Sequence, residues 1–118
     1  MAAGRRRPVT GAAGPGDLGP ATLPLRAGAR ARIRQPGIPN WPVPTSRLAF
    51  DEFQRGARES DGSAIEHAFE VSEWIAVNHD DAVRVVAIDG EVVEIELLAI
   101  PHVGRHAWVL RHQLTPAD

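Results

Sequence analysis

The stretch that most constrains the fold is residues 83–98, VRVVAIDGEVVEIELL, in which Asp89-Gly90 separates two runs rich in β-branched residues. An Asp-Gly pair between such runs is a strong short-range signal for a β-hairpin. A two-residue turn at Asp89-Gly90 would set valines of the first strand opposite glutamates of the second. A three-residue loop over residues 88–90, with Gly90 in a bulge, separates valines from glutamates, and we predict this register.

The predicted register gives the hairpin one core face and one outer face. It pairs Val85 with Val93 and Val83 with Ile95 on the core face. The outer-face pairs are Arg84 with Glu94, Val86 with Val92 and Ala82 with Glu96. The outer face would therefore carry a small apolar patch, with Ile88 at the loop tip, that another segment of the chain or a partner must cover.

The segment before the hairpin contains a strand and a proline-rich loop. In residues 25–34, Ala29, Ala31 and Ile33 alternate with arginines, which is typical of a half-buried strand. Residues 35–44 contain four prolines around Trp41, and we predict a stiff loop of polyproline-II character there.

A helix is predicted to begin after Thr45 or Ser46, either of which can cap it, and to break at Asp61-Gly62. Its expected apolar face consists of Leu48, Phe53 and Ala57.

Residues 63–77 fit two patterns. Ser63 and Glu66 have capping-box spacing, which favours a helix, whereas Phe69, Val71, Ile75 and Val77 fit a strand. We predict a short helix over residues 63–69 followed by a strand over residues 71–77. Residues 106–114, HAWVLRHQL, are predicted to form a last strand with apolar residues on both faces.

Length and composition limit the class of protein. A chain of 118 residues holds one domain, and the absence of cysteine excludes disulfides, thiolate metal sites and a cysteine nucleophile. We expect residues 1–24, rich in Gly, Pro and Ala, to be a disordered arm, and residues 25–118 to form a single β-rich domain with residues 35–70 inserted. No stretch is long and apolar enough for a signal sequence or a membrane span, so we expect a cytoplasmic protein.

Charge is distributed unevenly. Residues 1–34 hold seven arginines and one acid, a balance of +6, whereas residues 35–118 hold six arginines and fourteen acids, a balance of −8. All 13 basic residues are arginine, which a GC-rich genome explains without selection for phosphate contacts. A basic arm on an acidic body nevertheless indicates a charged partner or an intramolecular contact.

Three stretches of the chain resemble SH3-like small β-barrels. LRAGARARIR is similar to the opening strand of that superfamily, VRVVAIDGEVVEIELL to its central hairpin, and Gly104 with AWVLRHQL to the closing strand of bacterial SH3-type domains. The resemblance implies a mainly β fold with one or two short helices (α+β). That fold is either an SH3-like small barrel or a strongly curved antiparallel sheet, with a proline-rich and helical insertion. Such barrels bind peptides, nucleic acids or cell walls, or serve as assembly parts, so the fold leaves the function open.

No Gly-rich phosphate loop, GxSxG or HExxH motif is present, so we predict neither an enzyme nor a bound cofactor or metal. The first hypothesis is an accessory or adaptor protein that binds a protein partner. Its predicted partner-binding residues are Trp41, Arg84, Val86, Ile88, Val92 and Glu94.

Two alternatives remain. One is a nucleic-acid-associated protein, for which the candidate residues are Arg5, Arg6, Arg7, Arg30, Arg32 and Arg34. The other is a small metal- or ligand-binding domain using His106 and His112, which share parity with His102 on an extended segment.

Overall fold

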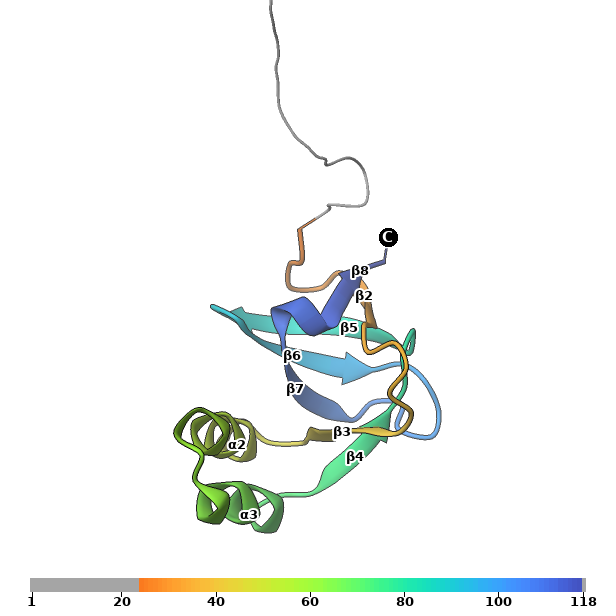
Figure 1. Cartoon of the computed structure of the whole chain (residues 1–118). Coiled ribbons are helices and arrows are strands. Elements are labelled where there is room, and N and C mark those ends of the chain that lie inside the picture. The colour runs from red at the N-terminus through yellow and green to blue at the C-terminus, as the bar shows by residue number, and fades with distance from the viewer. Residues whose placement is uncertain (1–23, 118) are drawn as a thin grey trace, which may run out of the picture.

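The computed structural model of the protein describes residues 24–117 and contains seven strands in two sheets with two short helices (Figure 1). The predicted mainly β class with short helices is thereby confirmed. The two sheets are open and do not close into a barrel. The predicted disorder of residues 1–24, apart from Pro24, and the candidates Arg5, Arg6 and Arg7 concern residues outside the described range.

The elements follow one another as β2 (Arg30–Ile33), β3 (Trp41–Pro44), α2 (Arg47–Glu59), α3 (Gly62–Glu70), β4 (Trp74–Val77), β5 (Ala82–Asp89), β6 (Val92–Leu97), β7 (His106–Leu110), the 3-10 turn η2 (Arg111–Gln113) and β8 (Leu114–Pro116). One sheet has the antiparallel order β7-β6-β5-β2-β8, and the other pairs β3 with β4. The core lies between the two sheets, and α2 and α3 lie together beyond β3 and β4 (Figure 1).

The strand faces of the central hairpin are as predicted, but its register is not. Val83, Val85, Val93 and Ile95 are all at most 1% exposed, which confirms the predicted core face. Val85 lies opposite Ile95, however, and not opposite Val93. A shift of two residues leaves every side chain on its own face, because side chains in a strand alternate with period two. Alternation could therefore identify the core without identifying the partners.

The predicted bulge at residues 88–90 is wrong. The structure has a two-residue turn at Gly90-Glu91, with Asp89 paired to Val92, and the register shift lies inside β5, between Val85 and Ala87. Gly90 adopts a φ of +61°, as primed hairpin turns require. Val86, at the irregularity, does not face Val92, so the predicted apolar pair on the outer face does not form.

The proline-rich segment is not a loop throughout as the sequence predicts, because its second half, Trp41–Pro44, is strand β3, paired with β4. Prolines at the alternate positions 42 and 44 leave the N–H groups of Trp41 and Val43 for that ladder. The opposite edge of β3 therefore lacks two donors, because proline has no N–H. Strands β3 and β7 lie side by side without pairing, and the two missing donors account for this.

Helix α2 begins where the sequence predicts but buries a different face. Ser46 is its N-cap and accepts a hydrogen bond from the Ala49 N–H at 3.2 Å. Leu48, predicted to be buried, is 59% exposed, and Ala57 is exposed too. The buried residues are Ala49, Phe50 and Gly56. Of the expected face, Phe53 packs against Phe69 and Trp74, but Leu48 and Ala57 are wrong, because the packing of α2 on α3 and beside β7 selects the buried side.

Helix α3 runs over Gly62–Glu70, so the predicted helix is confirmed with small shifts. Its N-cap is Asp61 and not Ser63, since the Asp61 Oδ1 accepts hydrogen bonds from Ser63 and Ala64 at 3.0 and 3.3 Å. Strand β4 follows from Trp74, three residues later than predicted. The strand predicted in residues 25–34 is confirmed only over Arg30–Ile33, as β2, in which Ala31 and Ile33 are buried, and Ala29 lies before it.

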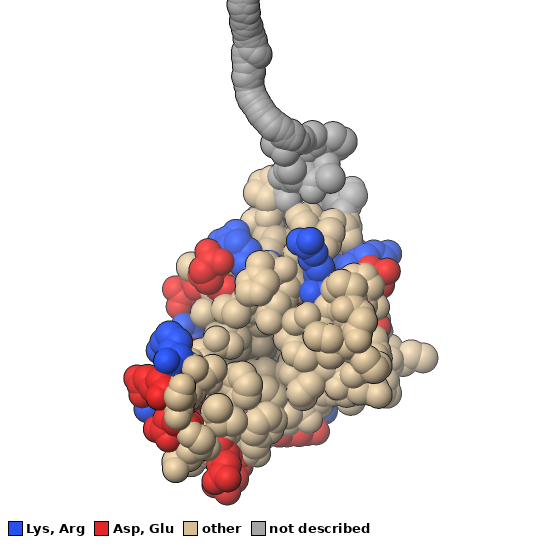
Figure 2. Space-filling view, in the orientation of Figure 1, with Lys and Arg blue, Asp and Glu red and all other residues tan. Residues whose placement is uncertain are grey.

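Charged side chains are not mixed evenly over the visible face. Figure 2 shows many acidic side chains on the side where Figure 1 places α2 and α3, and several basic ones near β2 and β8. Within residues 24–117, no helix has the length and apolarity needed to cross a membrane.

Candidate functional site

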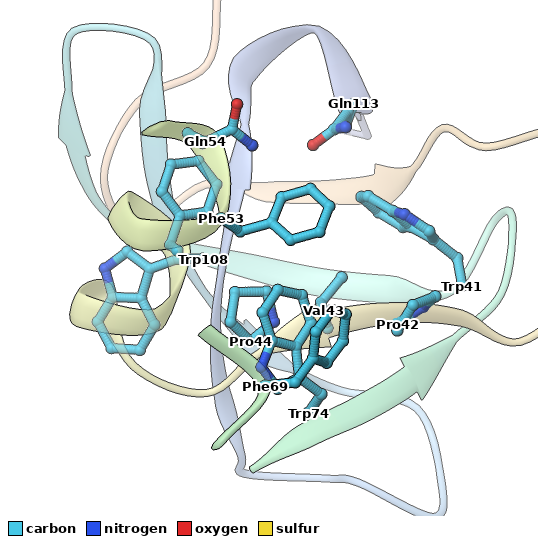
Figure 3. A pocket seen from close by; sticks show the side chains of 11 residues that line it. Trp41, Pro42, Val43, Pro44, Phe53, Gln54, Phe69, Trp74, Trp108 and Gln113 are labelled. Carbon is cyan, nitrogen blue, oxygen red and sulfur yellow. The ribbon is translucent and has the colours of Figure 1, made fainter. Parts of the chain in front are cut away.

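All six aromatic side chains of the chain line one pocket. The sequence has three tryptophans, three phenylalanines and no tyrosine. The pocket has a volume of about 130 Å³. Its lining residues are Trp41, Pro42, Val43, Pro44, Phe50, Phe53, Gln54, Phe69, Trp74, Trp108 and Gln113 (Figure 3).

The pocket forms because helices cover strand positions that alternation assigns to solvent. Trp74 lies opposite Pro44 on the face of β3 and β4 that points away from the core, since their neighbours Val43 and Ile75 are buried in it. Trp108 likewise lies on the outer side of β7, because the adjacent Ala107 and Val109 point inward. Helices α2 and α3 pack over these positions and add Phe50, Phe53, Gln54 and Phe69.

Three of the rings pack on one another and form one wall. The ring centroids of Phe69 and Trp74 lie 4.3 Å apart with an interplanar angle of 30°. Phe53 meets Phe69 edge-on at 5.9 Å and lies 5.5 Å from Trp74. Aromatic pairs at these distances add stability beyond the area that they bury, so this wall is held in place. Phe69 is still 46% exposed, so this wall is open to solvent.

Besides the indole N–H groups of the three tryptophans, the polar side-chain groups in the lining are the amides of Gln54 and Gln113. The Gln113 Oε1 accepts a hydrogen bond from the Leu110 N–H at 2.8 Å, so its amide NH₂ is left to donate. None of the lining residues carries a carboxylate, imidazole, amine or guanidinium group. The pocket therefore suits an apolar group with a nearby hydrogen-bond acceptor, and it offers no lining group for acid–base chemistry.

Ion pairs fix the helices that supply half of the pocket. Glu52 on α2 binds Arg55 at 3.0 Å and the Nδ1 of His67 on α3 at 2.9 Å. The hydrogen bond with His67, followed by that with Arg55, lowers the pKa of the Glu52 carboxyl below its usual value. The partner of His67 thus comes from the other helix.

A second set of ion pairs ties α2 to the hairpin turn. Arg47 binds Asp51 at 2.9 Å and Asp89, next to the turn, at 3.0 Å. Hydrogen bonds to these two carboxylates, that to Asp51 first, raise the pKa of the Arg47 guanidinium. Ion pairs thus connect helix α2 both to α3 and to β5.

The structure does not gather the six predicted partner-binding residues into one site. Trp41 lines the aromatic pocket. Glu94 lies opposite Trp108 and binds His106 Nδ1 at 2.8 Å, close to the pocket but not in its wall. Val92 lies opposite Leu110 and lines a groove against α2.

The other three predicted partner-binding residues lie apart from the pocket. Arg84 and Val86 occupy the outer face of β5, where Val86 is 36% exposed. Ile88 is half-buried and packs against the core. The arginines Arg30, Arg32 and Arg34 lie together, exposed, along β2 and the residue that follows it.

The predicted histidine set is spread over separate elements. His102 lies in the loop between β6 and β7, His106 begins β7 and His112 is in η2. Among residues 24–117 there is no group of three or more His, Cys, Asp or Glu side chains arranged to hold a metal ion.

Sequence reasoning missed most of the pocket, namely Phe50, Phe53, Gln54, Phe69, Trp74, Trp108 and Gln113. The available signal was the last strand, whose apolar residues on both faces require cover on both sides. Comparison of the chain with protein-family models, with curated proteins and with solved structures finds no match.

Proposed function

We propose that the protein is a small non-catalytic adaptor that binds a protein partner by taking an apolar side chain of that partner into the aromatic pocket. The observation that carries this proposal is the gathering of all six aromatic residues around a cavity without an ionisable lining group. Burial of one apolar side chain supplies about 1.5–3 kcal/mol, so the surrounding surface must add the rest of the affinity.

The composition of the pocket supports a protein partner. Tryptophan is enriched among the residues that dominate protein–protein binding energies, and three tryptophans line this cavity. The two glutamine amides suit the carbonyl and N–H groups that flank any side chain of a peptide. The resemblance of three stretches to SH3-like domains, which include peptide binders, agrees with this proposal. A cytoplasmic location is part of the proposal and rests on the cysteine-free composition.

The test compares proteins captured from cells by the full chain and by a Gln54→Glu variant. This change keeps the side-chain size and places a carboxylate in the apolar pocket, where an unpaired charge is costly. Gln35→Glu, the same change at a residue that does not line the pocket, is the control. We expect a partner captured by the wild type and by Gln35→Glu to be lost with Gln54→Glu.

A second variant protects the test against misfolding. Phe53→Ala enlarges the pocket while the core between the sheets is kept, and circular dichroism verifies the fold of every variant. Equal capture of the same partner by wild type, Gln54→Glu and Phe53→Ala, all folded, would end the proposal.

A further inference from the structure

Two arginines face each other in the five-stranded sheet. Arg30 on β2 is the cross-strand partner of Arg84 on β5. The adjacent residues Ala31 and Val83 are buried, which puts both arginines on the outer face of the sheet. Like charges directly opposite each other destabilise a sheet. The repulsion between these two arginines therefore lowers the stability of the sheet, and the fold itself gives no reason for the pair.

The backbone brings these two side chains to the closer kind of cross-strand site. The Val85 N–H donates to the Ala29 carbonyl at 2.8 Å, so the hydrogen-bonded pairs flank the Arg30–Arg84 position. Opposite residues at a non-hydrogen-bonded position have the shorter separation. Among the described residues, Arg84 forms an ion pair with Glu96 on β6 at 3.8 Å, whereas Arg30 forms none.

The positive charge continues along β2. Arg32 and Arg34 follow Arg30 at alternate positions, about 6.8 Å apart along an extended strand. Arg32 Nη1 donates to the backbone carbonyl of Asp80 at 3.0 Å, a neutral acceptor. Within the part of the chain that the structure describes, Arg30, Arg32 and Arg34 have no carboxylate within 4 Å. The result is a row of arginines at alternate positions that form no ion pair with the described residues.

The surroundings of the row limit what can bind. The cross-strand neighbours of Arg32 are small, Ala82 on one side and Thr115 on the other, and Arg32 is exposed. Glu94 and Glu96 lie on the same face of β6, the next strand beyond β5. The basic zone is thus two strands wide, about 5–10 Å, with carboxylates along one border. Figure 2 shows basic side chains at the end of the molecule where Figure 1 places β2 and β8.

We infer that this arginine row, defined as Arg30, Arg32, Arg34 and Arg84, binds the phosphodiester backbone of a single-stranded nucleic acid, separately from the aromatic pocket. Guanidinium groups bind phosphate oxygens in pairs and stack on bases, and the small neighbours of Arg32 leave room for such stacking. A duplex would bring its second phosphodiester chain against Glu94 and Glu96, which repel it within a Debye length of about 8–10 Å.

The test measures binding of a labelled oligothymidine of about 16 nucleotides to the full chain, by fluorescence anisotropy, between about 50 and 200 mM NaCl. Each phosphate contact to a single strand contributes about −0.7 to the slope of log K against log salt. We expect the double variant Arg30→Gln with Arg32→Gln to bind more weakly and to make that slope shallower by about 1.4. The control, Arg55→Gln with Arg58→Gln, removes two charges from α2 and should leave the slope unchanged.

The inference is overturned by no binding of the oligothymidine at the lowest salt concentration, by an unchanged slope in the double variant, or by an equal loss in the α2 control. Binding of a duplex or of polyglutamate as tightly as the oligothymidine also overturns it, in favour of a general anion site. If the double variant does not fold, Arg34→Gln, beyond the end of β2, should still change the slope by about 0.7. Gln54→Glu should not affect oligothymidine binding, so failure of the pocket proposal and failure of this one are distinguishable.

Discussion

The indole N–H of Trp74, at the start of β4, donates a hydrogen bond to the carbonyl oxygen of Ala68 in α3 at 2.9 Å. The last carbonyls of a helix have no partner within the helix, so this bond satisfies one of them. It also holds the Trp74 ring against Phe69, the closest of the three ring pairs. One side chain thus joins the end of α3, the strand that follows and the wall of the aromatic pocket.

Replacement of Trp74 by phenylalanine should lower the free energy of unfolding by about 1–3 kcal/mol. Phenylalanine keeps a ring in the cluster but leaves the Ala68 carbonyl without its donor. Urea denaturation followed by circular dichroism measures the change. Trp41→Phe is the comparison, since no hydrogen bond from the Trp41 indole is present among the described residues. A stability loss as large for Trp41→Phe would contradict the role of the hydrogen bond.

Gly56 and Gly62 should respond in opposite directions to substitution by alanine. A Cβ at Gly56 would lie 2.8 Å from Ile65 Cγ1 and 3.0 Å from two backbone atoms of the loop and α3, so Gly56→Ala should cost about 1–3 kcal/mol. A Cβ at Gly62 would meet nothing within 4 Å, so Gly62→Ala should be neutral or stabilise by up to about 1 kcal/mol. Thermal and urea unfolding of both variants test this, and equal effects would show that the close approach of the helices is not the cause.

Acid should weaken the contact between α2 and α3 through Glu52. Its carboxyl has a pKa below the ordinary value of 4.5 in the folded protein, because His67 and Arg55 bind the charged form. The stability that this shift provides is complete above the unfolded pKa and is lost as the pH falls through the lower folded pKa. The unfolding temperature of the wild type should therefore fall over that acidic range more than that of Glu52→Gln. Parallel pH profiles for the two proteins would contradict this assignment.

Arg30→Gln should raise the free energy of unfolding by about 0.2–1 kcal/mol, because it removes the repulsion from Arg84. Salt screens this repulsion, so the gain should shrink between low and high ionic strength. Arg84→Gln makes a useful contrast, since it also removes the ion pair with Glu96. Urea unfolding at two salt concentrations measures both variants, and a destabilised Arg30→Gln would show that Arg30 contributes to the fold.

The central hairpin shows what the alternation of apolar residues can predict and what it cannot. Alternation alone identified Val83, Val85, Val93 and Ile95 as core, and each is buried. It did not identify the pairing, because registers that differ by two residues bury the same side chains. The observed register follows from the Gly90-Glu91 turn and from an irregularity inside β5. The sequence of a single strand gives no signal for such an irregularity.

The local sequence pattern gave even less indication of the aromatic pocket. Phe50 and Phe53 come from α2, Phe69 from α3, Trp41 and Trp74 from the small sheet, and Trp108 from β7. Each residue has an ordinary local explanation as an apolar side chain of its own element. Only the packing of the helical pair over the outer side of two sheet edges brings them together.

The sequence by itself determined the strand faces, the start of the first helix after Thr45 or Ser46 and the mainly β class, because these depend on alternation and capping between near neighbours. The tertiary structure alone decided which side of α2 is buried, that Trp41–Pro44 pairs as a strand, and that Arg30 faces Arg84. The physical reason is that these outcomes depend on how separate elements pack or pair, α2 with α3 and β7, β3 with β4 and β2 with β5, which no local pattern specifies. The central Asp-Gly hairpin belongs to both groups, since its core face is local information and its register is not.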